Sequence, residues 1–384
     1  MEWNAKTNSL FYRRSKEKFL KSDKGEIMNW FKLGCNFDTK LIVAANELNQ
    51  KYSNSRIIEF YGSDQAHSFL AARPDFRLPD ISMVTLENYV KKCLDYGIAF
   101  NYTMNSIYPG SKLDLNYRKR SIQLFVKFLE DIGVQRVTIA NPLMILIIRE
   151  VSNIPIEIST IAHIDTISQM KYYHDSFNID KFCGNLYKNR AFKFLKAAAD
   201  YCSNTDTIYE VMVNEFCSSG AQSFSTNCVF RDSCYLCHAS NISNDDALLF
   251  NNYPMEFCMK GREVNPVNWL RSRFIRPEDL HYYCDIGINH FKITGRTGSV
   301  KYLTKIAEAY MSENWNGNLL HLWKPLETIQ TNENELEFKH GENIPNKKLD
   351  GFLNRWVDHP DFDCANTLCE NCKYCDHFYE DHLK

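Results

Sequence analysis

The amino-acid sequence predicts an α/β protein built on a closed (β/α)8 barrel of the TIM type. From residue 31 onward, short runs rich in β-branched and aromatic residues alternate with longer stretches of helical periodicity, which is typical of a parallel sheet. Eight such runs occur, and eight strands close a barrel. With 384 residues, 44% of them apolar, the chain can enclose a large core.

The strands are predicted in the following order along the chain. They lie at residues 31–35, 57–62, 98–105, 135–141, 155–161, 180–185, 207–214 and 290–295. Helices are predicted between them at residues 85–97, 121–132 and 188–201, and after the eighth strand at 299–311.

The segment 85–97 illustrates the helical prediction. Leu86, Tyr89, Val90 and Cys93 recur at helical spacing, and Gly97 stands where a left-handed C-terminal cap belongs. We therefore expect Cys93 to be a core residue.

Composition narrows the class of protein. The formal charge of −2 indicates neither a nucleic-acid polycation nor an acidic tail protein. The N-terminus carries charges where a secretory signal needs apolar residues, and the apolar run 142–148 is too short to cross a bilayer. We expect a cytoplasmic protein without membrane insertion, whose fourteen cysteines are thiols or metal ligands and not disulfides.

Three parts of the chain are predicted. Residues 1–28 form an N-terminal extension, and residues 29–324 form the barrel with a cysteine-rich insertion at 217–276, between strands seven and eight. Residues 325–384 form a linker, or a small strand pair, followed by a cysteine-rich tail.

The insertion predicts a metal site at the barrel mouth. Active sites of such barrels lie at the carboxyl ends of the strands, and the insertion begins just after the seventh strand. It carries Cys217, Cys228, Cys234, Cys237 and Cys258 among polar neighbours. Four converging thiolates suit an iron–sulfur cluster or tetrahedral zinc, whereas buried small hydrophobes would have apolar neighbours.

The tail predicts a second metal site. Cys364, Cys369, Cys372 and Cys375 are separated by four, two and two residues. The first two spacings match those of plant-type ferredoxins, and a zinc knuckle accommodates the same set. Both a 4Fe-4S cluster and zinc therefore stay open for the tail.

Several motifs resemble the collagenase-like peptidase family usually called U-32. They are "NEFC" at 214–217, "RDSCYLC" at 231–237, "FCMKGRE" at 257–263 and "IGINHFKITGRTGSVKYL" at 286–303. The resemblance spans roughly residues 30–312. It implies a barrel carrying a 4Fe-4S cluster, and it includes relatives that hydroxylate ubiquinone precursors or RNA without molecular oxygen, with prephenate as the implied oxygen donor in some.

The resemblance also implies cluster ligands. Cys217, Cys234 and Cys258 match the family's ligand positions, and Cys237 or Cys228 supplies the fourth because the family's second cysteine is Phe224 here. Cys35 is an outside candidate. The family's glutamate in "K-I-E-G-R" is Thr294 here, so neither RNA as the substrate nor prephenate as the oxygen donor carries over.

The strand ends supply candidate substrate-binding residues. These are Arg296, Lys292, Asn105 and Ser159. Arg296 is the first choice for a substrate carboxylate or phosphate because a guanidinium grips such groups bidentately; a structural salt bridge is the alternative. Amide-rich strand ends with few carboxylates disfavour glycosidase chemistry.

Three functions follow. The first is an iron–sulfur enzyme that performs oxygen-independent hydroxylation or related redox chemistry on a small molecule, RNA or peptide. The second is a peptidase, as the family name says, and the third is a non-catalytic iron–sulfur partner of an electron-transfer protein or heterodimer. No H-E-x-x-H motif supports a zinc protease.

Overall fold

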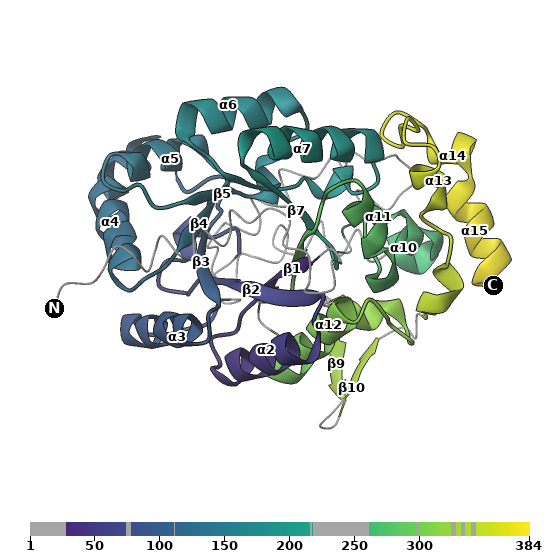
Figure 1. Ribbon diagram of the computed structural model, residues 1–384, viewed down its shortest axis with the longest axis horizontal. Coiled ribbons are helices and arrows are strands. Elements are labelled where there is room, and N and C mark those ends of the chain that lie inside the picture. Colours follow the sequence, from purple (N-terminus) through teal and green to yellow (C-terminus); the bar gives the residue numbers. More distant parts are fainter. Residues whose placement is uncertain are drawn as a thin grey trace.

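The computed structural model describes residues 28–73, 78–110, 112–215, 217, 261–296, 298–323, 328–331, 335–338 and 343–384. Eight parallel strands form a closed barrel in sequence order, and helices surround it (Figure 1). The predicted (β/α)8 barrel is therefore confirmed.

All eight predicted strands are present, with ends shifted by a few residues. Their bounds are β1 Asn29–Gly34, β2 Ser55–Gly62, β3 Ala99–Met104, β4 Arg136–Ile139, β5 Ile156–Ile158, β6 Lys181–Cys183, β7 Ile208–Met212 and β8 His290–Ile293. The barrel closes where residues 30–33 of β1 pair in parallel with residues 290–293 of β8. The carboxyl ends of these strands define the mouth, where the side chains discussed below gather.

The described helices follow the strands and continue into the C-terminal segment. They are α2 Lys40–Lys51, α3 Met83–Asp95, α4 Lys112–Asp131, α5 Pro142–Arg149, α6 Ile167–Phe177, α7 Phe192–Thr205, α10 Val267–Arg271, α11 Leu280–Asp285, α12 Val300–Met311, α13 Asn354–Val357, α14 Cys369–Cys372 and α15 Tyr374–His382. None of the helices in the described ranges is long and apolar enough to span a lipid bilayer.

Helix α3 ends as its sequence predicts. Gly97 has φ of +69°, and the amides of Gly97 and Ile98 donate to the carbonyls of Leu94 and Cys93. This pair of bonds is a Schellman cap. Cys93 is fully buried, as expected. Helix α4 begins at Lys112, nine residues before its prediction, because its first turns are too polar to show an apolar stripe.

The C-terminal segment packs beside the barrel. After the strand pair β9 Thr328–Thr331 and β10 Glu335–Phe338, helices α13, α14 and α15 lie next to α10 and α11 (Figure 1). An aromatic cluster of Phe352, Trp356, Tyr374 and Phe378 fills the junction, with ring centroids 4.9–6.0 Å apart. Aromatic side chains bury large apolar areas, so this cluster anchors the tail.

Candidate functional site at the barrel mouth

Arg296 lies just beyond the carboxyl end of β8 and is 8% exposed. Its Nη1 donates to Ser63 Oγ at 3.2 Å, and its Cζ lies 5.7 Å from the centre of the Tyr61 ring. No carboxylate of the described residues pairs with it. A Cβ on Gly34 would lie 2.9 Å from the Arg296 amide nitrogen, so glycine lets β1 approach this loop closely.

A second guanidinium reinforces the positive charge beside Arg296. Burial, and then the nearby Arg73, lower the pKa of Arg296 to about 9. Nearby cations repel each other, and an anion that binds to the buried Arg296 relieves that repulsion. This part of the mouth is therefore suited to a carboxylate or phosphate.

Lys292 lies one layer deeper, inside the barrel. Its Nζ is 4.5 Å from the centre of the Tyr61 ring and 3.8 Å from Cys183 Sγ. The Tyr61 ring thus lies near both Lys292 and Arg296, and the Tyr61 hydroxyl donates to the carbonyl of Ile293 at 3.3 Å. Lys292 faces the barrel interior, while Arg296 faces the mouth.

Asn105 and Ser159 form a second group at the ends of β3 and β5. The Asn105 amide donates to Ser159 Oγ at 3.3 Å, and its carbonyl oxygen accepts the Ala72 amide. Ser159 is fully buried and also accepts the amide of Ile161. The predicted substrate-binding residues therefore fall into two pairs, Lys292 with Arg296 around Tyr61, and Asn105 with Ser159.

Cys217 lies five residues beyond the end of β7 and is half-buried. Its Sγ is 3.7 Å from the hydroxyl of Tyr187, whose ring stacks on His163 at a centroid distance of 6.2 Å. The predicted ligands Cys228, Cys234, Cys237 and Cys258 lie outside the described residues. Cys217 is thus the member of the predicted mouth set that the structure positions.

Cys35, the outside candidate, lies in the packed core. Its thiol is next to Phe37 and Gly62, and burial raises its pKa to about 12. A protonated thiol surrounded by apolar groups is a poor metal ligand. The structure thus gives Cys35 a packing role.

Thr294 joins the ends of β7 and β8. Its amide donates to Asn214 Oδ1 at 2.6 Å, and Asn214 Nδ2 donates to the carbonyls of Thr294 and Leu322. Thr294 occupies the position where the U-32 family has glutamate, and here it links the ends of β7 and β8.

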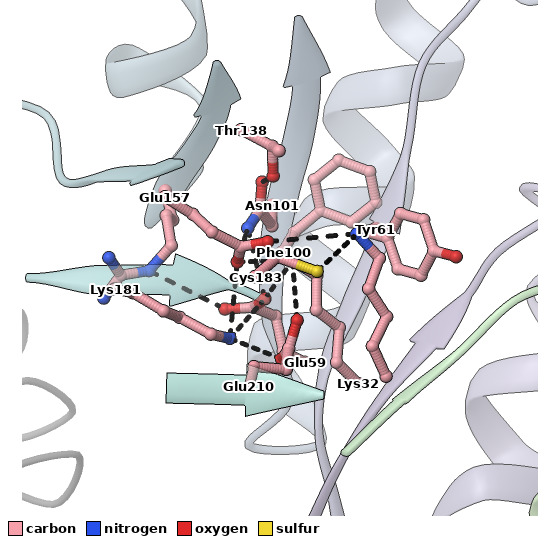
Figure 2. Close-up of polar contacts among 12 residues, drawn as sticks. Lys32, Glu59, Tyr61, Phe100, Asn101, Thr138, Glu157, Lys181, Cys183 and Glu210 are labelled. Atoms are coloured by element: carbon pink, nitrogen blue, oxygen red, sulfur yellow. Dashed lines mark hydrogen bonds and ion pairs between the residues drawn. The ribbon is translucent and has the colours of Figure 1, made fainter. Parts of the chain in front are cut away.

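A ring of polar side chains fills the barrel below the mouth (Figure 2). Each strand contributes one residue to this ring, which we call the polar ring. Its members, in strand order, are Lys32, Glu59, Asn101, Thr138, Glu157, Lys181, Glu210 and Lys292. All eight are buried, and the three lysines balance the three glutamates.

Short contacts connect the polar ring. Lys32 Nζ lies 2.5 Å from Glu157 Oε2 and 3.1 Å from Glu59 Oε1, and Lys181 Nζ lies 2.8 Å from Glu210 Oε2. Burial alone would raise the pKa of Glu157, but Lys32, Lys181 and Lys292 outweigh it and lower that pKa to about 2. Ionised partners in this geometry compensate one another.

Three side chains inside the barrel have the spacing of metal ligands. Ligand atoms of Glu157, Cys183 and Glu210 lie within 4.8 Å of one another. The ammonium groups of the polar ring already supply the positive charge there, and burial raises the pKa of Cys183 to about 11. The two carboxylates of this group are therefore part of an internal charge balance with the lysines.

The polar ring was not predicted, although the sequence contains a signal for it. Six predicted strands have one lysine or glutamate within an otherwise apolar run, as in "FKLGC" and "PIEIS". Side chains alternate between the two faces of a strand, so a charge at the same phase in each strand points inward.

The four tail cysteines are half-buried and lie around α14 and the start of α15. Arg273 Nη2 donates to Cys364 Sγ at 3.2 Å. Burial raises the pKa of Cys375 to about 12, and the charges that act on it come from Arg190, Cys364, Arg273 and Cys369. The structure therefore places Arg273 against Cys364 and both arginines near Cys375, while among the described residues no three of the tail sulfurs lie within 4.8 Å of one another.

The structure defines a (β/α)8-barrel protein whose motifs resemble those of the peptidase U32 family. No family model matches the chain. An uncharacterized protease of Methanocaldococcus jannaschii is 25% identical over 327 residues, which cover 85% of this chain and 86% of that protein.

Two solved structures show a weaker similarity to the chain. A U32 peptidase structure has 14% identity and a TM-score of 0.43, covering 60% of this chain and 84% of its own. An HpcH/HpaI aldolase from Desulfitobacterium hafniense has 9% identity and a TM-score of 0.31, covering 62% and 93%. The resemblance to the peptidase U32 family is confirmed, and the closed barrel itself establishes the fold.

Proposed function

We propose that this chain is a U32-like enzyme that binds an anionic substrate on Arg296 and modifies it beside a 4Fe-4S cluster. The reaction is an oxygen-independent hydroxylation or a related redox modification. Arg296 carries the proposal because a buried guanidinium without a carboxylate partner among the described residues is costly unless an anion arrives.

The site would hold the substrate from one side of the mouth. Arg296 presents several unused N–H donors, and Ser63 and Tyr61 fix its orientation. A planar guanidinium binds a carboxylate or phosphate through two parallel hydrogen bonds. Asn105 and Ser159, at the ends of β3 and β5, offer neutral hydrogen-bonding groups for the remainder of the substrate.

The cluster ligands in this proposal are Cys217, Cys234, Cys258 and either Cys237 or Cys228. The position of Cys217 just beyond β7 supports thiolates at the mouth. When bound, an iron–sulfur cluster supplies electron transfer. The protein's own part is to orient the anion and keep water away from it.

Anion binding is tested by titrating the full-length protein with inorganic phosphate and with benzoate in a calorimeter. We expect Arg296→Lys to weaken binding of one of these probes at least about tenfold, because an ammonium cannot replace the bidentate fork. The control is Arg56→Lys, an exposed arginine at the start of β2, on the opposite end of the barrel. Equal affinity in Arg296→Lys and wild type would refute the anion site.

The cofactor is tested by anaerobic purification. We expect a brown protein, and Cys258→Ser should remove the mouth iron while the tail metal stays. Unchanged iron content in Cys258→Ser would refute the ligand set. Iron without any turnover of candidate substrates would favour the non-catalytic partner.

A peptidase is the second candidate because the curated relative is called a protease. The buried thiols of Cys35 and Cys183 are unsuited to be the nucleophile of a cysteine peptidase, because the thiolate is the reactive form. Burial raises their pKa values to about 12 and 11. Cleavage of casein or collagen peptides by colourless, iron-free protein would establish the peptidase and overturn the redox proposal.

A further inference from the structure

Two buried arginines face the C-terminal cysteines without any carboxylate partner among the described residues. Arg190, between β6 and α7, is 2% exposed, and Arg273, between α10 and α11, is 4% exposed. Elsewhere in the same segment, Arg276 pairs with Asp279 at 2.7 Å and with Asp350 at 2.8 Å. The contrast indicates that Arg190 and Arg273 serve a different anion.

Arg190 is held firmly in place. Its Nη2 donates to the carbonyl of Ser272 at 2.6 Å, and its Cζ lies 4.6–5.2 Å from the ring centres of Trp356, Phe352 and Phe274. Its Nε and Nη1 are buried without a hydrogen-bond partner. The aromatic cluster thus orients a cation whose remaining donors await an acceptor.

Arg273 makes direct contact with the cysteines. Its Nη2 donates to Cys364 Sγ at 3.2 Å, and its Nε is buried without a partner. Arg190 and Arg273 both act electrostatically on Cys375, which in turn is close enough to Cys364 and Cys369 to feel their charge. Two buried cations therefore lie beside half-buried cysteines, with Arg273 in direct contact with Cys364.

The charges match a metal–thiolate centre. Without an anionic partner, both buried guanidinium groups stay uncompensated. When a metal binds, the thiols release four protons, and four thiolates around Zn²⁺ or a [4Fe–4S]²⁺ core carry a net charge of −2. Two guanidinium groups balance that charge.

We propose that Arg190 and Arg273 are the charge partners of a dianionic metal centre held by Cys364, Cys369, Cys372 and Cys375, and that this centre fastens the C-terminal segment to the barrel. The arginines are positioning residues: they stabilise the thiolates and do not ligate the metal. Hydrogen bonds to coordinating sulfurs and buried charge of this kind govern how tightly such metals are held. The inference is independent of the anion site at the mouth.

The centre is tested by elemental analysis of full-length protein purified without oxygen. The double variant Cys369→Ser/Cys372→Ser should lose either one zinc or about four irons relative to wild type, and either metal supports the centre. Its phosphate or benzoate titration at Arg296 should stay as in wild type, which separates this result from a failure of the mouth site. An unchanged metal content would overturn the proposal.

The role of the arginines is tested by chelator competition. Arg190→Met and Arg273→Met should each weaken retention of the tail metal about 10–100-fold. Arg190→Lys keeps the charge and should retain the metal more tightly than Arg190→Met. Arg271→Met is the matched control, because its guanidinium pairs with Asp376 at 2.8 Å and not with a cysteine.

Two further measurements report on the folding of each variant and on the attachment of its C-terminal segment. Far-UV circular dichroism confirms that each variant is folded, and limited proteolysis reports release of residues 343–384. We expect faster cleavage of this segment in Arg190→Met and in the double cysteine variant than in wild type. Equal metal retention by Arg190→Met and Arg190→Lys would overturn the charge-partner role.

Discussion

Two regions of this molecule bury positive charge, and they compensate it differently. In the polar ring, three lysines meet three glutamates within the barrel, with contacts as short as 2.5 Å. At the tail junction, Arg190 and Arg273 meet cysteines and no carboxylate among the described residues. The ring is balanced by the chain itself, whereas the junction becomes balanced when thiolates bind a metal.

The difference indicates which buried charges stabilise the fold and which are available to a ligand. A self-balanced network needs no ligand, and it fixes how the strands are arranged around the barrel. A buried cation without a carboxylate counter-charge marks a position where binding of an anion is favourable. Arg296 at the mouth belongs with the junction in this respect, because its side chain donates a hydrogen bond to the neutral Ser63 hydroxyl and pairs with no carboxylate of the described residues.

The largest effect is expected from breaking the polar ring. Glu157→Gln leaves three ammonium groups facing two carboxylates in a fully buried position. We expect the free energy of unfolding to fall by about 3–5 kcal/mol, as for other broken buried ion pairs. Urea denaturation measures it, and Glu87→Gln in the exposed pair with Lys91 is the control, with about 1 kcal/mol or less. Equal losses in the two variants would contradict the comparison.

Acid should weaken the ring next. The pKa of Glu157 is lowered from 4.5 to about 2, because burial is outweighed by Lys32, Lys181 and Lys292. A lowered carboxyl pKa stabilises the fold above pH 4.5, and this contribution is lost as pH falls towards 2, by about 3 kcal/mol in total. Urea titrations at several pH values should show a shallower decline in Glu157→Gln than in wild type. Parallel declines would mean that Glu157 is not stabilised by the lysines.

A double-mutant cycle should show coupling within the ring. Lys181 and Glu210 approach to 2.8 Å, and each is buried. Lys181→Met and Glu210→Gln should each destabilise, and the double variant should recover about 1–3 kcal/mol relative to their sum. Additive losses would show that these charges do not depend on each other.

The smallest effect is expected from Arg190→Met in protein stripped of metal by a chelator. The substitution removes a buried cation that then has no anionic partner, so we expect a change of about 1 kcal/mol or less, or a gain in stability. Urea unfolding of metal-free wild type and variant measures it. A loss as large as that of Glu157→Gln would show that the two regions are compensated in the same way.

The fold was predictable because the strands repeat a local pattern. Each of the eight runs could be recognised from its own residues, and Cys93 and Gly97 followed from helical spacing alone. Strand ends moved by a few residues because pairing with neighbours, and not composition, decides where a strand stops.

The candidate sites were predictable only in part. The spacing of the tail cysteines is local, so it pointed to a metal, but Arg190 and Arg273 are distant in sequence and reach that neighbourhood only through the fold. The polar ring was missed because each charge was read within its own strand. Closing the barrel is what brings six charges into contact.

The polar ring also constrains how the chain can be synthesised. Lys32 and its partner Glu59 emerge from the ribosome early, but Glu157 and Glu210 follow much later, and β8 must arrive before β1 has neighbours on both sides. An ammonium group cannot be desolvated stably before its counter-charges exist. The amino-terminal half of the nascent chain should therefore remain unfolded, and the barrel interior should become buried only when the final strand has been synthesised. We expect the chain to depend on chaperones during translation.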